Sequence, residues 1–204
     1  TEEENQYKKE NNLEGKIVVM YAGNLGYSQP LELIVDSAKA HLTNENLKYV
    51  VNGGGVRTDY IKYEAAKIDN LVFVEYQPFE RLPQVLSSAD IHLIMLKHGL
   101  GNVSVPSKIY NIFASGKPIV ASVDSGTEVE RLILEADAGL VVAPDEPGAF
   151  HEAIQKLLDD PSLRKKMGQS AQKWTKNFYS AEAVSKLYVE GIKELKTNNK
   201  KSLP

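Results

Sequence analysis

The chain has 204 residues, a formal net charge of -3 and no cysteine. This length suits one large domain with a sizeable core, and the small negative charge argues against a partner that needs a strong basic field, such as bulk nucleic acid. The lack of cysteine excludes disulfides and thiolate chemistry, and the four histidines lack the spacing of metal ligands, so we expect no metal and no cofactor.

Composition along the chain predicts three parts. Residues 1–15 form a polar lead-in, 16–195 form the folded domain, and 196–204 form a polar tail. The first residue is not methionine, so the chain reads as a fragment. No apolar run approaches the roughly 20 residues that cross a bilayer, and no signal peptide is visible, which favours a cytoplasmic location.

Six short apolar runs predict the strands of a parallel sheet. The first, at residues 16–22, is apolar without alternation, which is typical of a strand buried on both faces. The other five are expected at residues 47–51, 71–74, 91–96, 118–122 and 139–142.

Helical spacing of apolar residues fills the segments between these strands and after the last one. The first helix is expected to place an apolar stripe from Leu31 to Leu42 on the sheet. Further helices are expected at residues 60–68, 82–86, 108–115, 129–133, 147–158, 163–178 and 181–195. Strands that alternate with helices imply right-handed crossovers, so we predict an α/β fold with a doubly wound, parallel six-stranded sheet and C-terminal helices.

The helix at residues 108–115 carries the strongest candidate for a binding residue. Ser107 is a good N-cap, and Gly116 ends the helix. Helical spacing places Lys108 and Asn111 on the stripe opposite the one that faces the sheet. A cation and an amide in the first turn, beside free backbone N–H groups, predict a phosphate site. An ordinary solvated lysine is the open alternative.

Ligands of such sheets bind beyond the carboxyl ends of the strands, where this chain has two glycine-rich loops. The loops are expected at residues 23–26 and 52–55, and their glycines would supply unhindered N–H donors; tight turns are the alternative. Neither loop is a dinucleotide fingerprint, and no P-loop sequence exists, so a nicotinamide enzyme is disfavoured. The loop at residues 97–105 suits a segment that closes over a ligand.

Three other features have a structural and a functional interpretation. Ser125 and Glu128 fit a capping box, which we favour over a sugar contact by Glu128. Trp174 and Phe178 are one helical turn apart and are expected to pack together. His98 is read as a solvated loop histidine. No nucleophile or general base can be named from spacing.

Several short motifs occur in a characteristic order. They are Ala-Gly-Asn-Leu-Gly at 22–26, Gln-Pro-Leu-Glu at 29–32, Val-Asn-Gly-Gly-Gly at 51–55, Ser-Ala-Asp at 88–90, Val-Pro-Ser-Lys-Ile-Tyr at 105–110, Ala-Ser-Gly-Lys-Pro-Ile-Val-Ala at 114–121, Ala-Gly-Leu at 138–140 and Asp-Asp-Pro at 159–161. This series resembles the C-terminal, donor-binding domain of GT-B glycosyltransferases of group 1 (family 4), and it covers about residues 16–195.

The resemblance implies a Rossmann-like half of a GT-B enzyme that binds a nucleotide sugar, such as a UDP-sugar. It implies retaining, metal-independent hexosyl transfer, an N-terminal acceptor-binding domain that is missing here, and a last helix that crosses toward that domain. The motif at 105–110 resembles the branch that assembles capsule, O-antigen or other bacterial surface polysaccharides. The missing half could bring the enzyme to the inner face of the membrane, and the fragment alone is expected to be inactive.

The resemblance also implies roles for individual residues. Lys108 is the expected catalytic residue, because a leaving diphosphate gains charge that a positioned cation stabilises. Tyr76 and Gln77 would flank the base. The expected donor-binding residues are Gly23, Asn24, Gly53, Gly54, Tyr76, Gln77, Asn102, Val103, Pro106, Ser107, Lys108 and Asn111.

One departure from the family pattern is plain. Val103 and Asn111 stand where many relatives carry glutamates, so the usual glutamate roles do not transfer, although Asn111 can still bond a hydroxyl. A basic residue common after the first glycine loop is absent near Gln29, which puts more of the phosphate binding on Lys108 and on Arg57. Two alternatives stay open: a nucleotide-sugar 2-epimerase on the same architecture, and a non-catalytic nucleotide-binding module.

Overall fold

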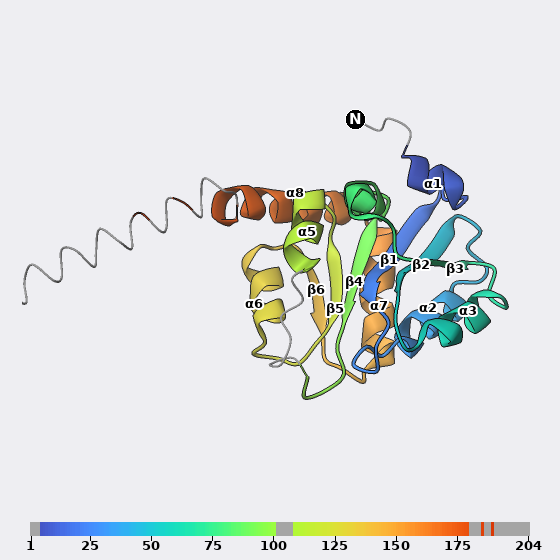
Figure 1. The fold of residues 1–204 in the computed structure, drawn as a ribbon. Coiled ribbons are helices and arrows are strands. Elements are labelled where there is room, and N and C mark those ends of the chain that lie inside the picture. The colour runs from blue at the N-terminus through green and yellow to red at the C-terminus, as the bar shows by residue number, and fades with distance from the viewer. Residues whose placement is uncertain (1–4, 101–107, 180–184, 186–188, 190–204) are drawn as a thin grey trace, which may run out of the picture.

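The strands form one sheet, shown in a computed structural model that describes residues 5–100, 108–179, 185 and 189. Its six strands are β1 Ile17–Asn24, β2 Leu47–Gly54, β3 Leu71–Val74, β4 Ile91–Met95, β5 Ile119–Ser122 and β6 Gly139–Val142. Every neighbouring pair is parallel, in the order β3-β2-β1-β4-β5-β6 (Figure 1). The predicted doubly wound α/β fold is confirmed.

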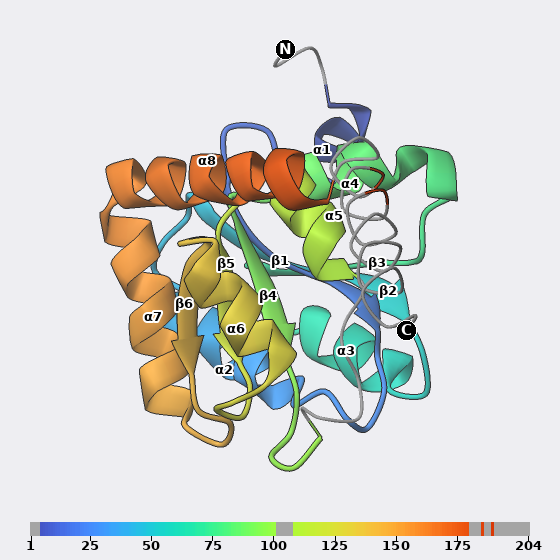
Figure 2. The same cartoon turned by 90° about the vertical axis from the view of Figure 1, so that its left-hand side faces the viewer.

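Helices cover both faces of this sheet (Figures 1 and 2). One layer contains α2 Glu32–Ala40, α3 Thr58–Ala65 and α7 Pro147–Asp159. The other contains α1 Gln6–Glu10, the 3-10 turn η1 Phe79–Arg81, and α4 Leu82–Ser87, α5 Lys108–Ser115, α6 Glu128–Glu135 and α8 Pro161–Phe178. None of the helices within the described ranges is long and apolar enough to cross a membrane.

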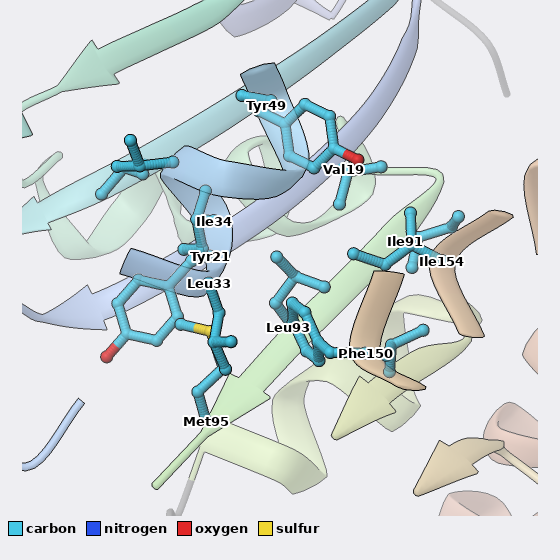
Figure 3. Packing of buried hydrophobic residues seen from close by; sticks show 14 of the residues in the cluster. Val19, Tyr21, Leu33, Ile34, Tyr49, Ile91, Leu93, Met95, Phe150 and Ile154 are labelled. Carbon is cyan, nitrogen blue, oxygen red and sulfur yellow. The ribbon is translucent and has the colours of Figure 1, made fainter. Parts of the chain in front are cut away.

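The unbroken apolar run of β1 is explained by burial on both faces. Val19 and Tyr21 pack with α2 and α7, whereas Val18 and Met20 point to the layer that holds α1 and α4. Figure 3 shows the first of these cores, where Phe150 of α7 lies beside Leu93 of β4. Alternate side chains of one strand therefore need opposite apolar layers.

Several predicted boundaries were wrong. β1 and β2 each run two or three residues further than expected, because Gly23 pairs with Gly53 and Asn24 pairs with Gly54. α2 ends at Ala40, and Leu42 beyond it is half exposed, so Leu42 does not belong to the apolar stripe. The predicted helix at residues 181–195 and the tail at 196–204 lie outside the described ranges apart from residues 185 and 189.

The segment expected as a polar lead-in contributes to the core from residue 5 onward. Tyr7 and Leu13 are fully buried against Met20 and Val85. Asn5 caps α1 through Lys8 N and also donates to Gln84 O of α4 at 2.8 Å. We call residues 5–13 the N-terminal strap, because they tie the first strand to α4.

The capping box predicted at Ser125 and Glu128 was wrong, because the N-cap of α6 lies two residues later. Thr127, not Ser125, is the N-cap of α6, and its hydroxyl accepts from Glu130 N. The Glu130 carboxylate accepts from Ser125 Oγ and Gly126 N, while Glu128 pairs with Arg131. Placing Thr127 at the cap lets Val129, Leu132 and Ile133 face the sheet, as the sequence predicted.

The predicted packing of Trp174 on Phe178 is confirmed, with ring centroids 5.4 Å apart. The same cluster holds α5, since Tyr110 stacks on Tyr179 at 3.9 Å and Trp174 meets Phe113 edge-on at 5.7 Å. α8 therefore fixes the position of the short helix that carries Lys108.

Candidate functional site

The carboxyl ends of all six strands meet at one edge of the sheet, where the arrowheads of β4 and β6 end in Figure 2. The strand order changes direction between β1 and β4, so the loops that leave these two strands diverge to opposite faces. This switch point is where open α/β sheets bind their ligands. α5 begins beside it with Lys108.

Lys108 reaches from α5 to the end of β1. Its Nζ donates to the backbone oxygen of Ala22 at 3.3 Å and lies 4.0 Å from the centre of the Tyr21 ring. No carboxylate pairs with it within the described ranges. Burial lowers the pKa of Lys108 to about 7. Lys108 is thus not the ordinary solvated lysine of the alternative interpretation, because its long side chain turns toward β1.

Gly23 leaves the space that the ammonium group occupies. A Cβ at Gly23 would lie 3.2 Å from Lys108 Nζ, and the φ of Gly23 is +148°, which side chains rarely tolerate. The Tyr21 hydroxyl donates to Asn24 O at 2.7 Å and so holds the ring under the lysine. Gly23, Asn24 and Lys108, three predicted site residues, are therefore brought together.

Several backbone groups of the two glycine loops form hydrogen bonds within the protein, so they are not open to a ligand. Leu25 N donates to Gly54 O at 2.9 Å, and Gly26 N donates to the Gln29 side chain at 3.0 Å. Gly55 N donates to Thr58 Oγ1 at 2.9 Å. The expectation that the loop glycines offer unhindered N–H donors was therefore wrong for Gly26 and Gly55.

Gly53 is required by strand pairing. A Cβ there would lie 1.9 Å from Gly23 O, so only glycine lets β2 approach β1 at this point. This close approach supports the structural interpretation of the glycine run at 53–55. Lys108 is then the clearest candidate for an anion-binding group among the described residues at this end of β1.

A second group of predicted site residues lies where β2 and β3 end. Tyr76 is 60% exposed, and its ring edge is 3.2 Å from the position of a Cβ on Gly54. The next side chain, Gln77, donates to Glu75 O at 3.1 Å and accepts from Arg81 at 2.9 Å. Buried Asn52 also donates to Glu75 O, at 2.7 Å, and anchors this segment. Gly54 and Tyr76 are thus neighbours in space, and Gln77 follows Tyr76 in the chain.

Asn111 lies one helical turn after Lys108 on α5. It is exposed and lines a groove of about 1380 Å³ between α5, α4 and α1, together with Gln84 and Ser87. Lys108 does not line that groove. The remaining predicted site residues, Asn102, Val103, Pro106 and Ser107, lie outside the described ranges.

Arg57 is paired with a carboxylate. Its guanidinium lies 2.5 Å and 3.1 Å from the Glu32 carboxylate and 4.5 Å from the Tyr60 ring centre. The Arg57 hydrogen bond lowers the pKa of the Glu32 carboxyl, so both groups are charged near neutral pH. Arg57 is therefore less available to a phosphate than the sequence suggested.

His98 is paired as well. Its Nδ1 lies 2.6 Å from Asp124 Oδ1, and Asp124 Oδ2 accepts from Gly99 N at 2.8 Å. Asp124 was not among the residues predicted from the sequence, although it lies only two residues after the strand expected at 118–122. Across the described ranges, no three histidine or carboxylate side chains come close enough to hold a metal ion.

The chain is similar in sequence to two curated relatives over much of its length. "Probable glycosyltransferase WbjE" of Pseudomonas aeruginosa is 33% identical over 71% of this chain and 36% of its own. "Putative colanic acid biosynthesis glycosyl transferase WcaI" of Escherichia coli K12 is 27% identical over 88% of this chain and 44% of its own. The chain thus spans less than half the length of these relatives.

Two solved structures share the fold. The C-terminal domain of a glycosyl transferase group 1 family protein, LpcC of Francisella tularensis, has a TM-score of 0.71 at 19% identity, over 89% of this chain and 95% of that one. Anabaena HepE, solved with UDP-glucose, has a TM-score of 0.74 at 14% identity, over 93% of this chain and 52% of that one. The fold is that of the Rossmann-like C-terminal half of a GT-B protein.

The family assignment rests on the match to a sequence model. The model described as "Glycosyl transferases group 1" matches residues 2–174, which includes the N-terminal strap, the glycine loops and Lys108. The chain therefore belongs to the group 1 glycosyl transferases.

Proposed function

We propose that this chain is the donor-binding half of a glycosyltransferase that moves a sugar from a nucleotide sugar, a UDP-sugar in the first instance, to an acceptor in surface-polysaccharide synthesis. Family membership, the role in the name of WcaI and the UDP-glucose complex of HepE support this proposal. The transfer is proposed to be retaining and to need no metal ion.

The position of Lys108 Nζ is the main support for this proposal. Its Nζ lies at the sheet's switch point, within the described ranges it has no carboxylate partner, and the carbonyl and the aromatic ring that hold it can be exchanged for a stronger ligand. A diphosphate is such a ligand, because charge-assisted hydrogen bonds are about twice as strong as neutral ones. As the sugar leaves, charge gathers on the diphosphate, and the ammonium stabilises it.

The other predicted residues complete the proposed donor site. Tyr76 and Gln77, which follow β3, are proposed to flank the base, and Gly23 and Asn24 to lie by the diphosphate. Asn111 is proposed to bond a ribose or sugar hydroxyl, since an amide cannot supply the charge of the glutamate common in relatives. The segment that holds Asn102, Val103, Pro106 and Ser107 is proposed to face the sugar.

A second Rossmann-like half is proposed to supply the acceptor site. The chain covers 36% and 44% of the lengths of WbjE and WcaI, which leaves room for such a half. Isolated, the chain is then expected to bind nucleotides and to transfer nothing. Location in the cytoplasm, at the inner face of the membrane through the other half, completes the proposal.

Calorimetric titration with UDP, GDP and ADP tests the donor site. Lys108→Ala is expected to weaken binding of the preferred nucleotide at least about tenfold, because a charged hydrogen bond contributes about 1.5–3 kcal/mol. Lys173→Ala is the matched control, since Lys173 is an exposed lysine on α8. No binding of any of the three nucleotides, or equal binding by the wild type and Lys108→Ala, would contradict the proposal.

A further inference from the structure

Arg81 connects two segments that are far apart in the sequence. Its Nη2 donates to Glu10 Oε2 of the N-terminal strap at 2.6 Å, and its Nη1 donates to Gln77 Oε1 at 2.9 Å. Arg81 lies at the junction of η1 and α4, between these partners. One guanidinium therefore spans from the strap to the residue beside Tyr76.

The strap side of this bridge is firmly anchored. Tyr7 is fully buried one turn before Glu10, and Asn5 donates to Gln84 O on the same helix that Arg81 begins. The Arg81 hydrogen bond holds the pKa of the Glu10 carboxyl below its usual value, so Glu10 is an anion at neutral pH. Glu10 can thus hold the guanidinium in place.

The bridge leaves Gln77 with a defined orientation. Arg81 occupies one lone pair of Oε1, and Glu75 O occupies one N–H of Nε2, so the oxygen and nitrogen of the amide cannot exchange places without losing both bonds. Counting the described residues, one N–H and one lone pair of the Gln77 amide remain for a ligand. Every nucleobase presents such donor and acceptor groups on its edge.

We propose that Arg81 is a positioning residue of the donor site, which orients the Gln77 amide for the base of the nucleotide. The inference rests on the proposed function and adds to it a residue outside the predicted set. Arginine is needed because its planar fork serves Glu10 and Gln77 at once, whereas the single ammonium of lysine cannot match both directions. Arg81 acts through Gln77 and need not touch the ligand.

The test separates the base from the phosphates with two probes. UDP and inorganic pyrophosphate are titrated into the 204-residue chain and into Arg81→Met, Gln77→Ala and the double variant. Arg81→Met is expected to weaken UDP binding about tenfold, the usual effect of one well-placed hydrogen bond, and to leave pyrophosphate binding unchanged. Gln77→Ala should show the same loss, and the double variant should show no further loss, because both changes remove one contact.

Two further variants distinguish positioning from folding. Glu10→Ala removes the brace but leaves the Gln77 contact, so UDP binding should fall less than in Arg81→Met. Arg81→Lys should not restore UDP binding, although it keeps the charge. Thermal unfolding of each variant reports separately on any loss of structure.

The inference fails if Arg81→Met weakens UDP and pyrophosphate equally, or if the losses of Arg81→Met and Gln77→Ala add in the double variant. It also fails if Arg81→Met binds UDP as the wild type does, and in that case the proposed function stands. A wild-type chain that binds no nucleotide would overturn the proposed function, and this inference with it.

Discussion

Among the described residues, no carboxylate pairs with the amine of Lys108. The groups around Nζ are the Ala22 carbonyl, the Tyr21 ring and the space above Gly23. His92 is buried nearby, and a charge on Lys108 disfavours a charge on the His92 ring. Burial is the main cause that lowers the pKa of His92 to about 4, so His92 is neutral near pH 7. A carbonyl and a ring face offset only part of the ammonium's lost hydration.

A proton should therefore accompany nucleotide binding. The pKa of Lys108 is about 7 in the free protein, so the amine is largely neutral at about pH 8, and a bound diphosphate would raise that pKa again. We expect uptake of about one proton per UDP at about pH 8, falling toward zero below about pH 6. Calorimetry in two buffers that differ in ionisation enthalpy measures this uptake.

Lys108→Met is the control for that experiment, since it keeps the apolar stem and cannot take up a proton. The lowered pKa of Lys108 also makes stability depend on pH. Between about pH 7 and about pH 10 the folded chain binds fewer protons than the unfolded chain. The free energy of unfolding, relative to that of Lys108→Met, should therefore rise with pH over this range. A UDP titration without proton uptake would show that Lys108 is already charged or makes no contact.

Gly53 should be the least replaceable glycine of the loops. An alanine Cβ would lie 1.9 Å from Gly23 O, so β1 and β2 must separate where they lead to the site. We expect Gly53→Ala to lower the free energy of unfolding by about 3 kcal/mol. Urea denaturation measures this change, and Gly148→Ala is the control, since nothing lies within 4 Å of its Cβ position in α7. Equal stability of the two variants would contradict the steric argument.

At the scale of elements, the start of α6 depends on Thr127. Its hydroxyl caps the helix, while Glu130 reaches back to Gly126 N. Thr127→Ala should cost about 1 kcal/mol in urea denaturation, the usual value of an N-cap. Ser125→Ala, at the position that the sequence suggested for the cap, should cost clearly less. The reverse order would restore the capping box predicted from the sequence.

α5 is short and depends on α8 for its placement. Gly168 of α8 comes so close to Gly116, at the end of α5, that an added Cβ would lie 2.1 Å from Gly116 O. Together with the stacking of Tyr110 on Tyr179, this contact fixes the position of α5 and of its first residue, Lys108. Lys108 thus meets β1 because of packing at the other side of its helix.

At the scale of the whole molecule, the folded unit includes the N-terminal strap. Tyr7 and Leu13 are fully buried, so removal of residues 1–15 should expose part of the core above β1. Tyr7→Ala alone should cost about 3 kcal/mol. Thermal unfolding of the shortened chain should show a lower and broader transition than that of the full chain.

Tyr7→Phe is the matched control for the strap. The Tyr7 hydroxyl is buried and has no hydrogen-bond partner among the described residues, so its removal should leave stability unchanged or raise it. A shortened chain as stable as the whole would mean that residues 1–15 are a lead-in after all.

Patterns that are local in the chain predicted the fold well. Both-sided burial makes a strand continuously apolar, and the helical period repeats within one or two turns, so β3, β6 and α5 were predicted with their observed bounds. The end of β1 was not, because Asn24 reads as a loop residue until Gly54 is placed beside it.

The sequence by itself determined the doubly wound sheet, the family and the position of Lys108 at the start of a helix, because each depends on residue types at short spacing. Only the tertiary structure decided which way Lys108 turns, that Gly53 serves a neighbouring strand, that Thr127 caps α6, and that Arg81 joins Glu10 to Gln77. These contacts join side chains to groups whose distance is set by packing rather than by chain order. The direction of a long side chain or the need for a glycine follows from the neighbour, and that neighbour is known only once the sheet has formed.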